Sequence, residues 1–290
     1  FILTAAAGFV FFFCLSPGGG RPHHSGPLVS FELEEKPRSD AKTYKFAVLA
    51  NGLQVVSVRD PSSERAAYAM AVQAGSWDDP VELPGLAHFC EHMLFLGTDK
   101  FPEASGYDNF ANAYGGEVNA FTEPEMTVYF TELSQNGLDG GLDRFGDLFR
   151  APRFNRSFVD KEVHAIDSEH SKNVQDPAWR ITSVLHSLAN PEAPVTHFRT
   201  GNLETLSRRP QRQEVDTVEA LRVWYRKHYC PNRMRLVTYS PESLEHQIEK
   251  VQHFFGDIPT GSEACQGPVR SHAKPVAWPP ERLGKWVTIL

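Results

Sequence analysis

Residues 85–98 read Gly-Leu-Ala-His-Phe-Cys-Glu-His-Met-Leu-Phe-Leu-Gly-Thr and contain the pattern His88-x-x-Glu91-His92. Each residue of an α-helix advances by about 100°, so these three polar side chains share one helix face. Two imidazoles four residues apart can bind one Zn²⁺ with the carboxylate beside it, in the inverse of the H-E-x-x-H motif. The other residues are mostly apolar, which predicts a buried helix whose polar groups need partners. The alternative is a helix with two ordinary histidines and a solvated glutamate.

A catalytic zinc also needs a third protein ligand and an open position for water. A second helix is predicted over residues 158–174, with a stop at Asp176-Pro177. Glu162 and Glu169 are seven residues apart on it, and they fall within about 20° of the same face. They are candidates for the missing ligand. A carboxylate pair on one helix face is also typical of solvated surface, and the spacing does not bring this helix to the first.

Residues 85–98 resemble the zinc-site helix of the insulysin/pitrilysin family of metallopeptidases. Further segments resemble the same family in the same order; they are 115–122, 142–145, 162–170, 200–206 and 229–244. The resemblance covers residues 44–259, most of the chain, and the insulin-degrading-enzyme branch fits best.

The resemblance implies that His88 and His92 bind a single zinc ion and that Glu169 is its third ligand. It implies that Glu91 is the general base of a metalloendopeptidase. Glu162 matches a second acidic position of the catalytic group, which supports the ligands rather than binding the metal.

The resemblance also implies that Asn119 and Ala120 lie on a strand whose backbone holds the substrate. The sequence departs from the family pattern just after this strand, at Glu123-Pro124-Glu125. We expect this acidic, loop-like stretch to influence which peptides lie along the strand.

These residues predict a zinc-dependent endopeptidase that acts on short or unfolded polypeptides. Zinc lowers the pKa of a bound water toward about 7 and polarises the scissile carbonyl. Glu91 then takes the proton of the water and passes it to the leaving amine.

Composition bounds the function in other ways. The 290 residues carry a formal net charge of −7, which gives no support for nucleic-acid binding. No C-x-x-C pattern occurs among the four cysteines, so a cysteine zinc site is not predicted. Cys90 points away from the two histidines and is interpreted as a core residue. A disulfide between Cys230 and Cys265 stays open at this stage.

Residues 1–16 begin with a nearly continuous apolar run, which is typical of a signal peptide. A membrane anchor and a gene-model artefact are the alternatives. A real leader predicts the secretory pathway or the extracellular space, whereas membrane-anchored and cytosolic locations stay open. Residues 17–42 are interpreted as linker.

The catalytic domain is expected at 43–260, and its fold class is α+β, with helices packed on a mainly antiparallel sheet. Asn51-Gly52 predicts a hairpin between strands at 45–50 and 53–59. Further strands are expected at 66–74, 117–121, 127–133 and 233–238, and further helices at 105–114, 138–149, 214–227 and 241–255.

Residues 261–290 are interpreted as linker, followed by the first strand of a further domain. The expected partners are peptide substrates and C-terminal domains beyond this chain; oligomer formation stays open. Two other readings remain. One is a zinc-binding but inactive half that binds peptides and needs a C-terminal half; the other is an organelle presequence-processing peptidase.

Overall fold

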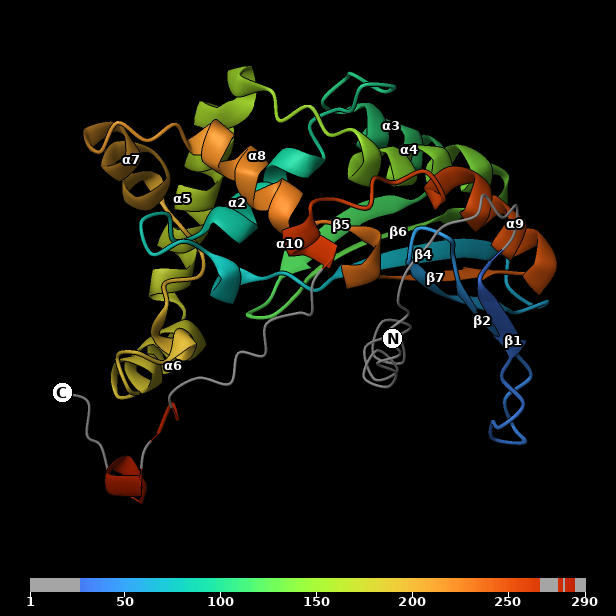
Figure 1. The fold of residues 1–290 in the computed structure, drawn as a ribbon, viewed down its shortest axis with the longest axis horizontal. Helices are drawn as coiled ribbons and strands as arrows, with labels where there is room; N and C mark the ends of the chain where they lie inside the picture. Colours follow the sequence, from blue (N-terminus) through green and yellow to red (C-terminus); the bar gives the residue numbers. More distant parts are fainter. Residues whose placement is uncertain (1–26, 267–275, 279, 285–290) are drawn as a thin grey trace.

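Figure 1 gives the computed structural model, which describes residues 27–266, 276–278 and 280–284. The predicted leader and the predicted strand near the C-terminal end lie outside these residues. No helix of the described part is both long and apolar enough to cross a membrane.

The described residues form a seven-stranded sheet in the order β1-β2-β3-β7-β4-β6-β5. Every neighbouring pair is antiparallel except β3 and β7, so the predicted mainly antiparallel sheet is confirmed. The strands are β1 (Val29–Glu32), β2 (Thr43–Val48), β3 (Gln54–Arg59), β4 (Arg65–Val72), β5 (Glu117–Thr122), β6 (Thr127–Ser134) and β7 (Met234–Ser240).

Alternation along the central strands decides which face of the sheet is covered. In β4, β6 and β7 every second residue is buried, as expected for a sheet with helices on one face. Helices α3, α4 and α9 lie along the sheet in Figure 1, whereas α2, α5 and α8 gather near β5. The longer helices are α2 (Leu86–Leu94), α3 (Gly106–Ala113), α4 (Leu138–Arg150), α5 (Val159–Gln175), α6 (Pro177–Ser187), α8 (Thr217–His228) and α9 (Leu244–Phe255).

Two predicted local signals are confirmed. Asn51-Gly52 lies in the turn between β2 and β3, where Val48 pairs with Gln54 and Gly52 adopts φ 93°. Helix α5 ends at Gln175, as the Asp176-Pro177 stop predicts.

The linker interpretation of residues 17–42 needs correction, because the sheet begins within them. Strand β1 pairs with β2 along the edge of the sheet through its backbone, and all four of its side chains are exposed. Because none of its side chains is buried, β1 does not need the alternating hydrophobic pattern by which a strand is predicted from sequence.

Helix α6 was not predicted. Asp176 ends one helix and starts the next, because its side chain accepts hydrogen bonds from the amides of Ala178 and Trp179. Pro177 occupies the first helical position, where its missing N–H costs nothing.

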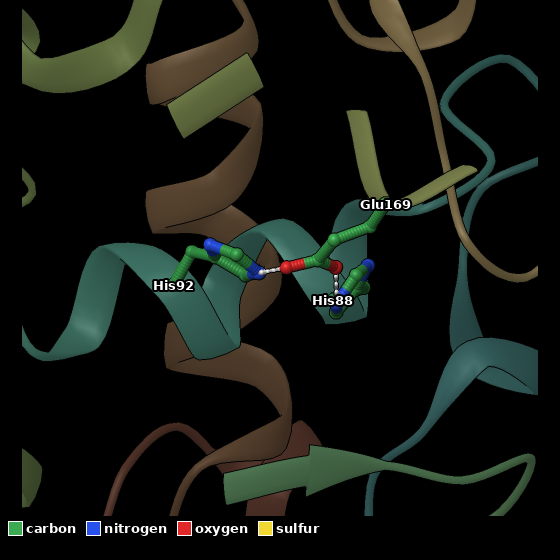
Figure 2. A group of neighbouring side chains, drawn as sticks. All are labelled: His88, His92 and Glu169. Carbon is green, nitrogen blue, oxygen red and sulfur yellow. Dashed lines mark ion pairs between the residues drawn. The ribbon is translucent and has the colours of Figure 1, made fainter. Parts of the chain in front are cut away.

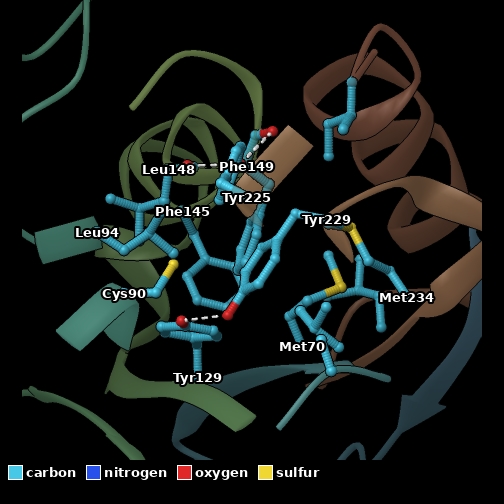
Figure 3. Packing of buried hydrophobic residues seen from close by; sticks show 14 of the residues in the cluster. Met70, Cys90, Leu94, Tyr129, Phe145, Leu148, Phe149, Tyr225, Tyr229 and Met234 are labelled. Carbon is cyan, nitrogen blue, oxygen red and sulfur yellow. Dashed lines mark hydrogen bonds between the residues drawn. The ribbon is translucent and has the colours of Figure 1, made fainter. Parts of the chain in front are cut away.

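The core between the sheet and the helices is rich in aromatic side chains (Figure 3). Tyr129 of β6 packs edge-on against Phe149 of α4, and its hydroxyl lies 2.8 Å from that of Tyr229. Phe145 is fully buried and contacts Phe149 at a ring-centroid distance of 5.2 Å. The hydroxyls of Tyr129 and Tyr229 pair with each other because a buried hydroxyl without a partner is costly.

Cys230 and Cys265 form a disulfide, which settles the pairing that the sequence left open. It ties the short helix α10 (Glu263–Gln266) to the segment that precedes β7. The predicted linker from residue 261 therefore begins with an attached helix. Cys90 is buried, in agreement with its interpretation as a core residue.

Replacing Phe145 with Ala is expected to lower the free energy of unfolding by about 3–5 kcal/mol, because it opens a cavity in the core. Chemical denaturation monitored by circular dichroism measures the change. Phe31→Ala on β1, where the side chain is 44% exposed, is the matched control and should cost about 1 kcal/mol or less. Equal losses in the two variants would contradict this location of the core.

Candidate metal centre

Helix α2 carries the His88-x-x-Glu91-His92 pattern, and Gly85, its N-cap residue, adopts φ 94°. Asp79 lies ahead of the helix, and its carboxylate accepts hydrogen bonds of 2.7 Å from the amides of Gly85 and Ala87. A carboxylate at this end satisfies amides that have no partner within the helix and favours the helix dipole. Burial raises the pKa of Asp79 well above its ordinary value, whereas the amide donors act in the opposite direction. Sequence analysis missed Asp79 because it lies six residues before Gly85, outside the position next to the helix where a cap is expected.

Glu169 of α5 lies between the two imidazoles of α2 (Figure 2). One carboxylate oxygen is 3.3 Å from Nε2 of His88, and the other is 3.6 Å from Nε2 of His92. One donor atom from each of these residues lies within 4.8 Å of the others. The structure thus brings together the three residues that the resemblance implied as ligands.

The donor set and its spacing fit zinc. Two imidazole nitrogens and a carboxylate are a common set for a catalytic zinc that keeps one open position. Bonds of about 2.0–2.1 Å in a tetrahedron separate neighbouring ligand atoms by roughly 3.3 Å. The distance of 3.3 Å between Nε2 of His88 and one oxygen of Glu169 matches that edge length, and the three ligand atoms together lie within 4.8 Å of one another.

Each histidine is oriented through its other ring nitrogen. Nδ1 of His92 lies 3.2 Å from a carboxylate oxygen of Glu162, which is 8% exposed. Nδ1 of His88 lies 2.8 Å from the backbone carbonyl of Thr200. Partners of this kind hold the ring nitrogen Nε2 toward a metal. Glu162 therefore lies where a supporting residue would, one contact away from the ligand group.

The pKa values of the metal-free group follow from these contacts. Burial alone would lower the pKa of His92, but hydrogen bonds with Glu162 and Glu169 raise it to about 9. Hydrogen bonds from His88 and His92 hold the pKa of Glu169 well below its ordinary value, although burial opposes the shift. Without metal, a proton on His92 offsets the negative charge of the carboxylates.

Glu91 lies on the same face of α2 and is 9% exposed. The hydroxyl of Thr122, at the end of β5, donates a hydrogen bond to its carboxylate. Burial raises the pKa of Glu91, whereas His88 and the Thr122 hydroxyl act in the opposite direction. A raised pKa suits a carboxylate that takes up and returns a proton near neutral pH. Sequence analysis quoted Thr122 in a motif but gave it no role.

Strand β5 is the open edge of the sheet beside α2. Asn119 and Ala120 lie in its middle, opposite Phe130 and Tyr129 of β6. The amide of Ala120 donates to the side-chain oxygen of Asn119, at 2.8 Å. This amide therefore already has an acceptor within the strand.

The acidic stretch Glu123-Pro124-Glu125 forms the turn of the β5–β6 hairpin. The amide of Glu123 donates to the carbonyl of Met126, and the carbonyls of Glu123 and Pro124 accept from Ser76 and Trp77. The stretch is thus a turn fixed by backbone contacts, at one end of the proposed substrate strand.

Cys90 and the other histidines that the structure describes contribute no ligand atom to this group. Within the described part of the chain, His88, His92 and Glu169 form the one cluster of at least three such side chains that could hold a metal ion. His164 bonds to the carbonyl of Asp160 on its own helix.

Comparisons with known proteins show which family this chain is similar to. A family model described as Insulinase (Peptidase family M16) matches residues 54–192, and one described as Peptidase M16 inactive domain matches residues 217–289. The insulin-degrading enzyme of Drosophila melanogaster is 38% identical over 93% of this chain and 27% of its own length. The A-factor-processing enzyme of Saccharomyces cerevisiae is 36% identical over 88% of this chain and 24% of its own length.

The crystal structure of pitrilysin superimposes with a TM-score of 0.78 at 29% identity, and the match covers 86% of this chain and 26% of that one. The predicted α+β fold is confirmed by this likeness. The chain spans about a quarter of the length of the curated relatives it matches.

We expect the purified chain to bind about one zinc ion and the Glu169→Gln variant to bind it much more weakly, because a neutral amide replaces the charged ligand. Elemental analysis after dialysis against a weak chelator measures the stoichiometry. Glu249→Gln, an exposed position on α9, is the matched control and should keep its zinc. A well-folded wild-type chain without zinc would contradict the metal centre.

The raised pKa of His92 predicts opposite pH dependences for folding and for metal binding. Its charge stabilises the metal-free fold below the ordinary value of 6.5, and this contribution is lost as the pH rises through about 9. Zinc needs the neutral ring and should bind more tightly over the same interval. Thermal unfolding and zinc titrations across this range measure both. In Glu162→Gln, which loses a carboxylate that raises the pKa, both transitions should move to lower pH; unmoved transitions would refute the assignment.

Proposed function

The chain belongs to the insulinase family of peptidases, peptidase family M16, and from this premise we propose that it carries the zinc site of an endopeptidase. The substrates would be short or unfolded polypeptides. The proposal rests on one observation: the side chains of His88, His92 and Glu169 lie close together, and a buried Glu91 lies on the same helix as the two histidines.

In this proposal His88, His92 and Glu169 hold the metal, and each other nearby residue has a separate task. Zinc, when bound, supplies the Lewis acidity that activates a water molecule and polarises the scissile carbonyl. Glu91 accepts the proton of the attacking water and donates it to the leaving amine. Thr122 holds the carboxylate of Glu91 in position, in keeping with their hydrogen bond.

The edge of β5 is the proposed place for the substrate backbone. An extended peptide can add to an exposed sheet edge through main-chain hydrogen bonds. Asn119 and Ala120 lie on this edge, on the strand whose end contacts Glu91 through Thr122. An arriving peptide carbonyl would replace the oxygen of Asn119 as the acceptor for the Ala120 amide. Asn119 would therefore keep that amide paired until a substrate binds.

A second candidate is a zinc- and peptide-binding half that becomes active only with further domains. It is favoured by the length of the relatives, of which this chain spans about a quarter. Under either candidate the domain limits 43–260 stay proposals, and the attached helix α10 suggests that the folded unit extends at least to Gln266.

The Cys230–Cys265 disulfide supports a location in the secretory pathway or outside the cell, because such bonds persist in oxidising compartments. It supports this proposal independently of the apolar leader.

Glu91→Gln is expected to keep zinc and lose turnover by about 10²–10⁴-fold, because the amide cannot accept the proton. Cleavage of a quenched fluorescent peptide measures turnover, with the chain alone and after addition of a separately expressed C-terminal half from a relative. Glu249→Gln is the matched control and should cleave like the wild type.

Turnover by the chain alone that is lost in Glu91→Gln supports the endopeptidase. Turnover that appears only with the added half, and is again lost in the variant, favours the second candidate. Near-normal cleavage by Glu91→Gln with zinc bound would show that the general base lies elsewhere.

A further inference from the structure

We propose that residues 200–205, which lead into the π-helix η5 (Glu204–Arg208) and are called here the clamp loop, form a third structural element of the metal centre. It would fix the ring of His88 and tie helix α2 to helix α5, which carries Glu169. The inference rests on the proposed zinc site and extends it to residues that bind no metal.

The first observation is the contact between the clamp loop and His88. The backbone carbonyl of Thr200 lies 2.8 Å from Nδ1 of His88, although 112 residues separate the two in the chain. A carbonyl can only accept, so the ring carries its hydrogen on Nδ1. Nε2, the other ring nitrogen, then points toward Glu169, 3.3 Å away, on the side of the proposed metal. The clamp loop therefore selects the tautomer and ring orientation that a metal ligand needs.

The second observation is a direct backbone contact between the clamp loop and the start of α2. A Cβ atom on Gly85 would lie 2.3 Å from Cα of Gly201, and one on Gly201 would lie 3.1 Å from Cα of Gly85 and 2.8 Å from Leu206. Both glycines also have positive φ values, 94° and 76°. Only glycine at both positions allows this approach. The approach sets how near the Thr200 carbonyl comes to His88.

The third observation is the attachment of the clamp loop to α5. The carboxylate of Asp167 accepts a hydrogen bond of 2.9 Å from the amide of Leu203. Asp167 lies on α5 two residues before Glu169. Within the clamp loop, Asn202 and Thr205 bond each other's amides through their side chains, at 2.9 and 3.1 Å. The clamp loop is therefore held by hydrogen bonds of its own and contacts both helices that supply ligands.

Zinc affinity, measured beside the stability of the metal-free fold, distinguishes a positioning role from ordinary packing. A loop that only packs would affect the stability of the metal-free fold. A loop that orients His88 would also change the affinity for zinc, because an outer contact of this kind is commonly worth a 10–100-fold change.

Gly201→Ala and Asp167→Ala test the two attachments separately, so the inference stays testable if one variant fails to fold. Asp167→Asn keeps a side-chain oxygen as acceptor and is the conservative variant. Gly52→Ala is the matched control, because Gly52 has a similar φ of 93° but lies in the β2–β3 hairpin. The zinc dissociation constant is measured by competition with a chromophoric chelator, beside the thermal midpoint of each metal-free chain.

We expect zinc binding to weaken by about 10–100-fold in Gly201→Ala and Asp167→Ala. Asp167→Asn should stay within about threefold of the wild type, because it retains the acceptor. Gly52→Ala should lower the thermal midpoint and leave zinc affinity unchanged. If the wild-type chain binds zinc and both Gly201→Ala and Asp167→Ala bind it equally tightly, the clamp is overturned but the proposed function stands. No zinc on the wild-type chain would overturn the proposed function and the clamp with it.

Discussion

The structure depends on one constraint, which is that helix α2 must be buried and yet carries three polar side chains. Its apolar residues pack into the core, and polar groups on a buried helix are costly unless each has a partner. His88 pairs with the Thr200 carbonyl, His92 with Glu162, and Glu91 with Thr122. These partners come from three separate parts of the chain, so satisfying one helix determines how the strand, the second helix and the loop around it are arranged.

The same polar contacts bring the proposed ligands together. Glu169 lies near both imidazoles, and its negative charge is matched by the proton that the raised pKa of His92 retains. A metal ion would replace this proton beside the carboxylates of Glu162 and Glu169. Zinc binding would release this proton, so the metal affinity of the site is coupled to pH.

An edge strand of the sheet, β5, lies beside the proposed metal centre. β5 is the last strand of the sheet, so its outer edge is not paired with another strand, and it ends at the residue that holds Glu91. The same hairpin is fixed at its turn by backbone contacts with Ser76 and Trp77. The proposed peptide site and Thr122, which contacts the proposed general base on α2, thus belong to one hairpin.

The sequence by itself determined the features that depend on residue spacing along one element. The 3.6-residue period predicted that His88, Glu91 and His92 share a face and that Glu162 and Glu169 do the same, and the Asn51-Gly52 turn predicted its hairpin. Spacing did not choose between the two glutamates; the resemblance implied Glu169, and the tertiary structure places it against both histidines. Only the tertiary structure showed that Asp79, Thr122 and Thr200 contact helix α2. These contacts join segments far apart in the chain, and the position of one element against another follows from packing of the whole core, which no local pattern encodes.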